Sequence, residues 1–421
     1  MRLSPSTALP FLLLASTLPA QEPADLARLE SRCAEAGAKA AEIRGLTLRR
    51  KVAVRVVDRQ EHAQQLVDET ERAFGGRLDE VEAFLARFDL IPKKLRLKPA
   101  LTLFATQAVG ASYDKNTVRL FDAEPSEALL VHEMTHALQD QNFALLAQAE
   151  QASGLDAILA FQALLEGDAD FVEGIFAIPE DLKDAEAHAR RLRAETEAGE
   201  AATRAAALTA PPVFSRTQTF WYTRGEEFVL ALYRKGGWAA VNRAWGAPPD
   251  SCEQVLHPEK YLERERPVRL DTSGLEAELI ADGWAIRYAT TAGELILEIW
   301  LEQRAPRPLD AATCFRAAAG WGGDRAIFAE RGKKRLGVWL TTWGTPEDAA
   351  EFCAAARRNL RGDAAGADTE DRAVRTSSDG RHAALRRGAD VLLVFGCPEK
   401  TLALVESEAW KSPHVVPVER K

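Results

Sequence analysis

Two histidines and a glutamate near residue 134 have the spacing of a metal-binding helix. They lie in the segment His132-Glu133-Met134-Thr135-His136. Side chains four residues apart on a helix are separated by about 40° around its axis, so both imidazoles can reach one ion. Neutral imidazole is a good ligand for zinc, and the glutamate between the histidines can point at a water on the metal. The pattern H-E-x-x-H therefore predicts a hydrolytic metal centre, with Zn²⁺ as the expected cofactor.

The third protein ligand is expected on a second helix. A catalytic zinc site has three protein ligands and one open position. The longer pattern with a third histidine is absent, because Gln139 and Asn142 occupy its glycine and histidine positions. Glu166 lies 30 residues beyond His136, in a segment that predicts a helix able to pack antiparallel against the first. Asp170 follows Glu166 by about one turn, so its carboxylate can accept a ring N–H from a ligand histidine.

These residues together resemble the gluzincin class of zinc peptidases, the thermolysin-like group. In that class, the two motif histidines and a glutamate from the next helix bind zinc, and an aspartate four residues later orients a histidine. The resemblance implies that His132, His136 and Glu166 bind the metal, that Asp170 supports a ligand histidine, and that the fold is zincin-like.

Longer segments narrow the resemblance. Residues 132–141 and the string Glu166-Gly167-Asp168-Ala169 are similar to a group of largely uncharacterised secreted bacterial proteins of the gluzincin type. Residues 251–261 resemble a downstream motif of that group, with Cys252 where threonine is usual. The resemblance covers about residues 50–265. The resemblance identifies the zinc site specifically but says little about the substrate.

Other polar side chains are candidates to assist the reaction. Zinc peptidases usually add a second group that stabilises the oxyanion of the tetrahedral intermediate. Tyr222, Tyr113 and His257 are candidates, with packing in a helix interface or capping of a turn as the alternative for each. Asp140, four residues after His136, is an alternative metal ligand, although a capping or solvent-facing role is favoured.

Hydrophobic periodicity predicts an α+β catalytic domain over residues 21–264, with paired active-site helices. A turn is expected at 110–116, and an Ala-, Glu- and Arg-rich connector at 181–208. The expected strands are 52–57, 101–104 and 117–121. The expected helices are 21–50, 61–88, 125–141, 154–176 and 220–245, the last broken at Gly236-Gly237.

A second, small α+β domain is expected over residues 265–421. Apolar β-branched and aromatic runs predict strands at 338–343 and 391–395. Helices are expected at 346–360 and 399–410. The Gly-rich stretch 319–325 lacks the Lys-Ser/Thr of a phosphate loop and is interpreted as a turn.

The first 20 residues have the features of a signal peptide. Arg2 supplies a positive start, residues 8–15 are largely apolar, and Ala20 provides a small residue for cleavage. The mature chain is then expected to begin near Gln21 and to be secreted or periplasmic. No later segment approaches the 18 or so apolar residues of a membrane span.

Composition limits the partners. The formal net charge is -9 and the isoelectric point is near 5.5, which argues against nucleic acid or anionic membranes as the main partner. The 5 cysteines cannot all pair within one chain, and no CxxC spacing suggests a thiolate metal site. If a disulfide forms, Cys353 with Cys397 is the favoured pair. The oligomeric state is left open.

The expected function is zinc-dependent hydrolysis of peptide bonds in a peptide or protein substrate outside the cytoplasm. Glu133 is expected to act as general base on the zinc-bound water. The strand 117–121 is expected to offer an exposed edge for pairing with extended substrate. An aminopeptidase and a non-catalytic binding protein with the same fold remain alternatives. Glu133 is intact, which argues against the second, and no acidic pocket for a substrate amine is evident from the sequence.

Overall fold

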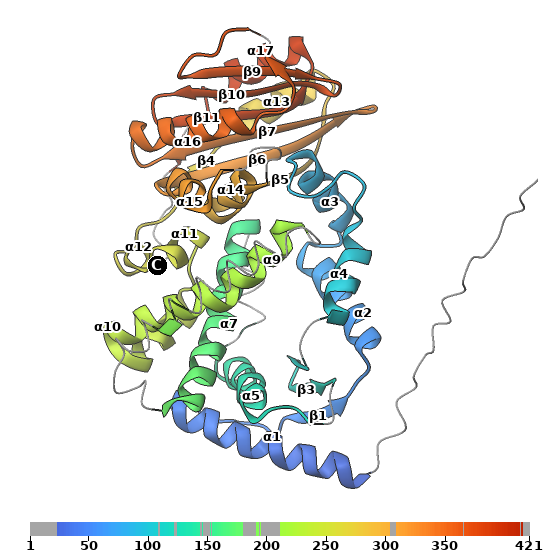
Figure 1. The fold of residues 1–421 in the computed structure, drawn as a ribbon, viewed down its shortest axis with the longest axis vertical. Helices are drawn as coiled ribbons and strands as arrows, with labels where there is room; N and C mark the ends of the chain where they lie inside the picture. Colours follow the sequence, from blue (N-terminus) through green and yellow to red (C-terminus); the bar gives the residue numbers. More distant parts are fainter. Residues whose placement is uncertain are drawn as a thin grey trace, which may run out of the picture.

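The computed structural model describes residues 23–415, except 108–109, 122–123, 144, 146–151, 153, 180–190, 193, 195–210, 304–308, 365 and 413. A helical region surrounds a small three-stranded sheet, and a second region is built on a seven-stranded sheet (Figure 1). This combination confirms the predicted α+β class. The expected signal peptide and most of the expected connector at 181–208 lie outside the described residues. No described helix is long and apolar enough to cross a membrane.

The small sheet has the order β1–β3–β2, with its strands at Ala53–Val56, Thr117–Leu120 and Ala111–Asp114 respectively. β3 runs parallel to β1 and antiparallel to β2. The turn between β2 and β3 places Lys115 and Asn116 at φ of 44° and 63°, as a two-residue hairpin requires. The prediction of an exposed edge at 117–121 is therefore wrong, because β3 has a partner strand on each side. β2 is an edge of this sheet, and most of the expected turn at 110–116 is strand.

Long helices pack against the small sheet and against one another. Helix α5 (Glu127–Asn142) contacts both α1 (Pro23–Arg44) and α7 (Leu155–Ala177), and α7 contacts α10 (Gly225–Gly246). Buried side chains from α1, α5 and the small sheet form one apolar cluster that includes Val118, Leu130 and Leu138. α10 is interrupted at Gly236 and Gly237, as predicted. The two helices that carry the candidate metal ligands are therefore held side by side within a packed core.

Two glycines let α7 cross the next helical segment at very short range. The π-helix η2 (Phe220–Arg224) precedes α10. A Cβ at Gly167 would lie 2.1 Å from the carbonyl carbon of Gly225, and a Cβ at Gly225 would lie 2.2 Å from the carbonyl oxygen of Ala163. Only residues without a side chain fit this crossing, which brings η2 against the middle of α7.

We expect Gly167→Ala to destabilise the protein by at least roughly 1–3 kcal/mol, because the atoms in its way belong to the backbone and cannot rotate aside. Thermal unfolding of the purified protein measures the effect. Gly246→Ala is the matched control, since it makes the same change in α10 where an added Cβ meets no atom within 4 Å. The control should be neutral or slightly stabilising. Equal melting temperatures for wild type and Gly167→Ala would contradict the close crossing.

A helical arm connects the small sheet to the large one. It consists of α2 (Arg59–Ala73), α3 (Leu78–Arg87) and α4 (Leu97–Gln107). The single helix predicted over 61–88 is interrupted at Gly75 and Gly76, whose φ values of 61° and 74° suit glycine. The strand predicted at 101–104 is wrong, because these residues lie in α4. A short apolar run cannot be assigned to strand or buried helix by periodicity alone.

The seven-stranded sheet is antiparallel throughout, in the order β5–β6–β7–β11–β10–β9–β8. Its strands are Ala285–Thr290, Trp321–Arg331, Lys334–Trp343, Asp390–Cys397, Gly380–Arg387, Arg372–Ser377 and Asp363–Ala364, in that order. The predicted strands at 338–343 and 391–395 are confirmed as parts of β7 and β11. The turn expected at 319–325 is wrong from Trp321 onward, because β6 begins there.

Helices cover both faces of the large sheet. One apolar cluster joins the sheet to α14 (Gly293–Glu302), α15 (Ala311–Ala318) and α16 (Pro346–Asn359). A second cluster joins the opposite face to α13 (Ser273–Ala281) and α17 (Glu399–Ala409). The remaining described elements are α9 (Pro212–Thr219), α11 (Cys252–Leu256), α12 (Pro258–Leu262), β4 (Arg269–Leu270) and β12 (His414–Val415).

The disulfide predicted between Cys353 and Cys397 does not form. Cys353 lies in α16 and belongs to the apolar cluster on one face of the large sheet, whereas Cys397 belongs to the cluster on the other face. All five cysteines are buried free thiols. Burial raises the pKa of the Cys353 thiol to about 11 and that of Cys397 to about 12, so both are inert hydrophobic side chains.

The core continues across residue 265. Phe88, which directly follows α3, packs edge-on against Trp339 and Phe395 of the large sheet, with ring centroids 5.4 Å and 5.0 Å apart. The apolar cluster that contains them also includes Leu164 of α7. The strands of the large sheet all come from the C-terminal region, but an N-terminal helix supplies part of its covering layer.

Candidate metal centre

Helix α5 holds the H-E-x-x-H segment inside the protein. Ser126 caps the helix, its Oγ accepting the backbone N–H of Leu129 at 3.1 Å. Every residue from Leu130 to Gln139 is buried, because α1 packs on one side of α5 and α7 on another. The two histidine rings therefore project into the interior, toward α7.

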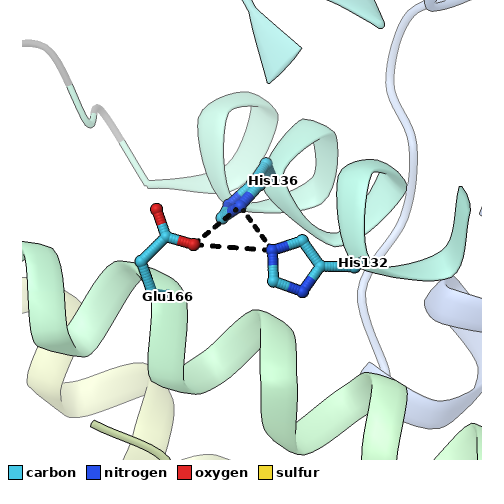
Figure 2. Close-up of side chains that lie close together, drawn as sticks. All are labelled: His132, His136 and Glu166. Carbon is cyan, nitrogen blue, oxygen red and sulfur yellow. Dashed lines mark hydrogen bonds and ion pairs between the residues drawn. The ribbon is translucent and has the colours of Figure 1, made fainter. Parts of the chain in front are cut away.

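His132, His136 and Glu166 converge on one point. The Nε2 atoms of the two histidines lie 3.1 Å apart, and Glu166 Oε2 lies 3.4 Å from each of them. Figure 2 shows the three side chains facing one another across the space between α5 and α7. The ligand set predicted from the sequence is thus brought together, with one donor atom from each residue.

The spacing of these three atoms suits a small tetrahedral ion. With metal–ligand distances of about 2.0–2.1 Å, neighbouring ligands in a tetrahedral zinc site are about 3.3–3.4 Å apart. The three separations of 3.1, 3.4 and 3.4 Å match that edge length. Two buried histidines and a partly buried glutamate that could together hold a metal ion are therefore present in the described residues.

The partners of the opposite ring nitrogens fix the protonation of both histidines. His132 Nδ1 lies 3.0 Å from Asp170 Oδ1 and 3.2 Å from Glu173 Oε2. His136 Nδ1 lies 2.8 Å from Gln139 Oε1. All three partners are acceptors, so each Nδ1 carries a proton. Each Nε2 therefore faces the shared point and presents a lone pair there whenever its ring is neutral.

Three electron-rich atoms that face one another require a positive charge between them. In the metal-free protein, that charge comes from protons. Burial alone would lower the pKa of His132, but its hydrogen bonds with Asp170, Glu166 and Glu173 outweigh burial and raise the pKa well above its ordinary value. Burial would raise the pKa of Glu166, but the charges and hydrogen bonds of His136 and His132 hold it well below its ordinary range. A divalent cation satisfies the same three atoms with both rings neutral.

Glu133 lies beside this cluster with an unused oxygen. Its side chain is 5% exposed, and its Oε2 has no hydrogen-bond partner among the described residues. Burial raises the pKa of Glu133, while the nearby charges of His132 and His136 oppose that rise. Glu133 does not belong to the group of atoms that could share one ion. A buried carboxylate with a raised pKa and a free lone pair is suited to accepting a proton.

Asp170 lies where the sequence predicted it, but it does not act alone. Glu166, Asp170 and Glu173 follow one another at intervals of four and three residues along α7, so they share a face of the helix. Asp170 and Glu173 both reach the Nδ1 of His132. Sequence reasoning missed Glu173, although its i+7 spacing from Glu166 was a usable signal. The two carboxylates orient the ring of His132 and make its Nε2 a stronger donor.

We expect Asp170→Ala to weaken zinc affinity by roughly 10–100-fold, toward the lower end because Glu173 remains. Competition with a fluorescent chelator at fixed pH measures this affinity. Asp140→Ala is the control from the neighbouring helix. It removes a carboxylate that bonds the hydroxyl of Tyr113 rather than a histidine, and it should keep wild-type affinity. Unchanged affinity in Asp170→Ala would show that this residue does not support the ligand.

A second network, which sequence reasoning missed, holds His136. Gln139 accepts from His136 with its Oε1 and donates its Nε2 to Leu165 O at 3.0 Å and to Asp168 Oδ2 at 3.2 Å. These two acceptors determine which way the amide points. Asp168 in turn accepts from Arg44 Nε at 2.8 Å, and both side chains of that ion pair are completely buried. A buried Gln three residues after the second motif histidine was the available signal.

Asp168, two residues after Glu166 on α7, belongs to a structural ion pair and not to the cluster. Trp245 Nε1 also donates to its Oδ2, at 3.1 Å. Arg44 further donates to Asn242 Oδ1 at 2.8 Å and stacks over the ring of Trp238 at 4.4 Å. Through these contacts, Asp168 links α7 to α1 and α10 next to the candidate centre.

Tyr222 is the predicted oxyanion candidate that the structure brings to the cluster. Its ring centroid is 6.3 Å from that of His132. The negative charge of Glu166 first, and then burial, raise the pKa of its hydroxyl well above the ordinary value. The phenol therefore keeps its proton, which a hydrogen bond to Glu166 helps to retain. It lies on η2, a single π-helical turn, and such turns are frequent at functional sites.

The other candidates contact different groups. His257 Nε2 bonds Glu294 Oε1 of α14 at 2.9 Å, and none of its described partners belongs to the His132–His136–Glu166 cluster. Tyr113 donates its hydroxyl to Asp140 Oδ2 at 2.6 Å and accepts the backbone N–H of Asn116, so both side chains support the β2–β3 turn. The structure thus gives His257 and Tyr113 no place at the cluster and offers no ligand role for Asp140.

Comparisons with known proteins say little about this centre. A family model described as a domain of unknown function, DUF8575, matches residues 282–406, which cover most of the large-sheet region and none of the cluster. A solved structure described as a proposed hydrolase with a novel fold from Chloroflexus aurantiacus matches at 20% identity, with a TM-score of 0.33, over 57% of this chain and 89% of that one. That likeness is too low to carry an argument. The search of curated proteins found no match.

Proposed function

We propose that this protein is a zinc-dependent peptidase of the gluzincin type. The observation that carries the proposal is the meeting of two imidazole nitrogens and one carboxylate oxygen beside a buried glutamate with an unused oxygen. Two histidines and one carboxylate with an open position are a donor set of hydrolytic zinc sites. The same set also serves iron(II) in oxygenases, but Glu133 within the H-E-x-x-H segment favours hydrolysis.

The arrangement of the ligands supports a zincin-like catalytic region. Both histidines come from one helix, α5, and the glutamate comes from the next long described helix, α7, which packs against it. A small sheet packs on the same helix, with edge strand β2 in contact with α5. The order of the two helices supports the resemblance, in which a glutamate from the helix after the histidines completes the ligand set.

The residues divide the proposed reaction between them. Zn²⁺ bound at this centre would lower the pKa of a coordinated water and polarise the scissile carbonyl. Glu133 takes the proton from the attacking water and returns it to the leaving amine. The Tyr222 hydroxyl, which keeps its proton, donates a hydrogen bond to the oxygen that becomes negative in the transition state. Asp170, Glu173 and Gln139 hold the two imidazoles in place.

An extended peptide is the substrate form that fits the fold. β2 pairs with β3 on one side only, and it contacts α5, which carries the histidines. A strand edge offers main-chain donors and acceptors at regular spacing to an added strand. We assign substrate pairing to β2 rather than to β3, whose two edges are both used.

Two rival functions keep the same centre. A zinc aminopeptidase would need carboxylates placed to receive a substrate amine; Asp170 and Glu173 are already engaged by the ring N–H of His132. A non-catalytic binding protein would gain nothing from a buried Glu133 with an unused oxygen, which costs free energy to maintain. The first observation argues against the aminopeptidase and the second against the binding protein, so together they favour an enzyme that cleaves internal peptide bonds.

An unbiased peptide library at neutral pH tests the proposal. The wild-type protein should cleave internal peptide bonds, lose this activity on treatment with a zinc chelator, and recover it on addition of Zn²⁺ but not Mg²⁺. Removal of single N-terminal residues would point to the aminopeptidase. A protein that binds one zinc and cleaves nothing would support the binding-protein rival.

We also propose that the protein acts outside the cytoplasm, since residues 1–20 have the composition of a signal peptide. Expression of the full chain in a bacterium, followed by N-terminal sequencing of the exported fraction, should give a first residue at or near Gln21. Recovery of the intact chain, still beginning at Met1, from the cytoplasm alone would contradict export.

A further inference from the structure

A cavity of about 530 Å³ lies where the end of α3 meets the large sheet. Its wall is formed by the β6–β7 turn, the β9–β10 turn and the residues that end and follow β11. Figure 1 shows α3 beside the ends of β6 and β7. None of the residues of the candidate metal centre lines this cavity, so it is a separate feature of the molecule.

The lining of the cavity is strongly basic. Five cationic side chains surround it, and a single carboxylate, that of Asp379, accompanies them. The whole chain has a formal net charge of -9, so this concentration of positive charge runs against its overall composition. The five cations are Arg87, Lys93, Lys333, Lys334 and Arg335.

Arg87 forms a buried part of the wall. It is 5% exposed, and its Nη2 donates to Asp379 Oδ2 at 3.0 Å while its Nη1 donates to Arg335 O at 3.3 Å. Its Nε has no partner among the described residues. A Cβ at Gly396 would lie 2.4 Å from Arg87 Nη1, so the guanidinium needs a glycine at that position. The cation is therefore built into the fold rather than placed on a flexible surface side chain.

The one carboxylate is already occupied. Besides Arg87, Asp379 accepts from Lys93 Nζ at 3.0 Å, and its Oδ1 lies 3.0 Å from His382 Nε2. It orders two of the cations, and a third, Arg335, pairs with Glu330 Oε1 at 3.2 Å. The ammonium groups of Lys333 and Lys334 have no hydrogen-bond or ion-pair partner in the described part of the chain. Exposed lysines with no counter-charge, next to a buried arginine, leave a site that favours an anion.

We propose that this cavity binds a ligand that carries a phosphate group. A phosphate presents several acceptor oxygens and up to two negative charges. It can therefore bind the ammonium groups of Lys333 and Lys334 and the ordered guanidinium of Arg87 at the same time, which a single carboxylate does less well. The volume lies within the range of small-molecule sites, so a phosphate with a small organic body fits. The site takes either inorganic phosphate or a phosphate ester. This inference is independent of the proposed peptidase activity.

Isothermal titration of the full-length protein with inorganic phosphate, pyrophosphate and glycerol 3-phosphate, at constant ionic strength, tests the site. At least one of them should bind with one-to-one stoichiometry. If phosphate binds more tightly than glycerol 3-phosphate, the ligand is the free anion; if glycerol 3-phosphate binds more tightly, the ligand is a phosphate ester. The double variant Lys333→Ser with Lys334→Ser should bind at least about tenfold more weakly, because each lost charged hydrogen bond costs about that factor.

The control removes the same net charge elsewhere. Lys94→Ser with Lys400→Ser changes two exposed lysines that do not line the cavity, and it should bind within about twofold of wild type. Absence of binding by all three anions at millimolar concentration would overturn the proposal. Equal binding by the Lys333/Lys334 variant would also overturn it, since the anion would then sit elsewhere, for example on the metal centre. If a polyglutamate peptide binds more tightly than any of the three phosphates, the proposed phosphate site is wrong and the cavity is a site for acidic peptides.

Discussion

Replacing Glu133 with glutamine should leave the protein folded and loaded with metal, yet slow peptide cleavage by about 10²–10⁴-fold. The amide has the shape of the carboxylate but cannot accept a proton from water. Glu133 is not among the atoms that could share the ion, so the metal content should not change. Cleavage of a peptide taken from the library screen, measured at saturating zinc, gives the ratio of kcat/KM.

Glu127→Gln is the matched control for this variant. It makes the same substitution on the same helix, at an exposed position in the first turn of α5. Its cleavage rate should equal that of the wild type within about twofold, as surface changes usually do. If Glu133→Gln cleaves as fast as this control, Glu133 is not the general base, and its unused buried oxygen has no catalytic role.

Loss of Glu166 should have an equally large effect, by a different route. Structural zinc sites bind with about 10–16 kcal/mol, so each of four ligands contributes roughly 3 kcal/mol and its loss weakens binding more than about a hundredfold. Glu166→Ala should therefore purify with little zinc and cleave no peptide. His132→Ala combined with His136→Ala should lose both properties completely. Circular dichroism should stay near wild type, because a chain of this size has a core that does not need the metal to fold.

Glu173→Ala is the control that separates ligand from support. Glu173 lies on the same face of α7 but contacts only the Nδ1 side of His132. It should retain stoichiometric zinc with a moderately reduced affinity. Full zinc retention in Glu166→Ala would contradict the ligand set. The third ligand would then be sought at Asp140, Asp168 or His257. Each of these would need a rearranged site, since each is engaged elsewhere.

The chemistry of the centre was readable from the sequence because helical spacing is local. Residues 132 and 136 share a helix face whenever the segment is helical, and Glu166 with Asp170 follows the same rule on the next helix. The separation of 30 residues between His136 and Glu166 allowed the two helices to pack together, and the resemblance to a known class supported that packing. Residues that act across helices were not readable: Gln139 reaches Asp168 of α7, which is held by Arg44 of α1, 124 positions earlier in the chain.

The order of the strands in the small sheet also could not be predicted from the sequence. The segment 117–121 was recognised as a strand, but its pattern says nothing about how many neighbours it has, and β1, more than 60 positions earlier, occupies one of its edges. The same limit explains the disulfide error. Cys353 and Cys397 lie in neighbouring elements of one region, yet a sheet separates them, and only the assembled layers show which face each thiol joins.

Most of the large sheet was missed for a related reason. β6 carries Gly322, Gly323 and Asp324, which are typical turn residues, but tertiary contacts require them here. A Cβ at Gly323 would lie 2.0 Å from Val268 O, so another segment of backbone occupies the space of a side chain. Asp324 is buried because its carboxylate accepts the backbone N–H groups of Ala292 and Gly293 at 2.8 Å and 2.7 Å. Long-range contacts override local propensity at these positions.

X-ray absorption at the zinc edge, on wild-type protein purified without added metal, is the most direct test of the central claim. The account predicts one zinc per chain with four nitrogen or oxygen neighbours at about 2.0–2.2 Å, contributed by His132, His136, Glu166 and one water. No sulfur neighbour is expected, since no thiol in the described residues belongs to the group of donor atoms that could share the ion. Sulfur scattering at about 2.3 Å, a six-coordinate iron signal, or the absence of stoichiometric metal would contradict it.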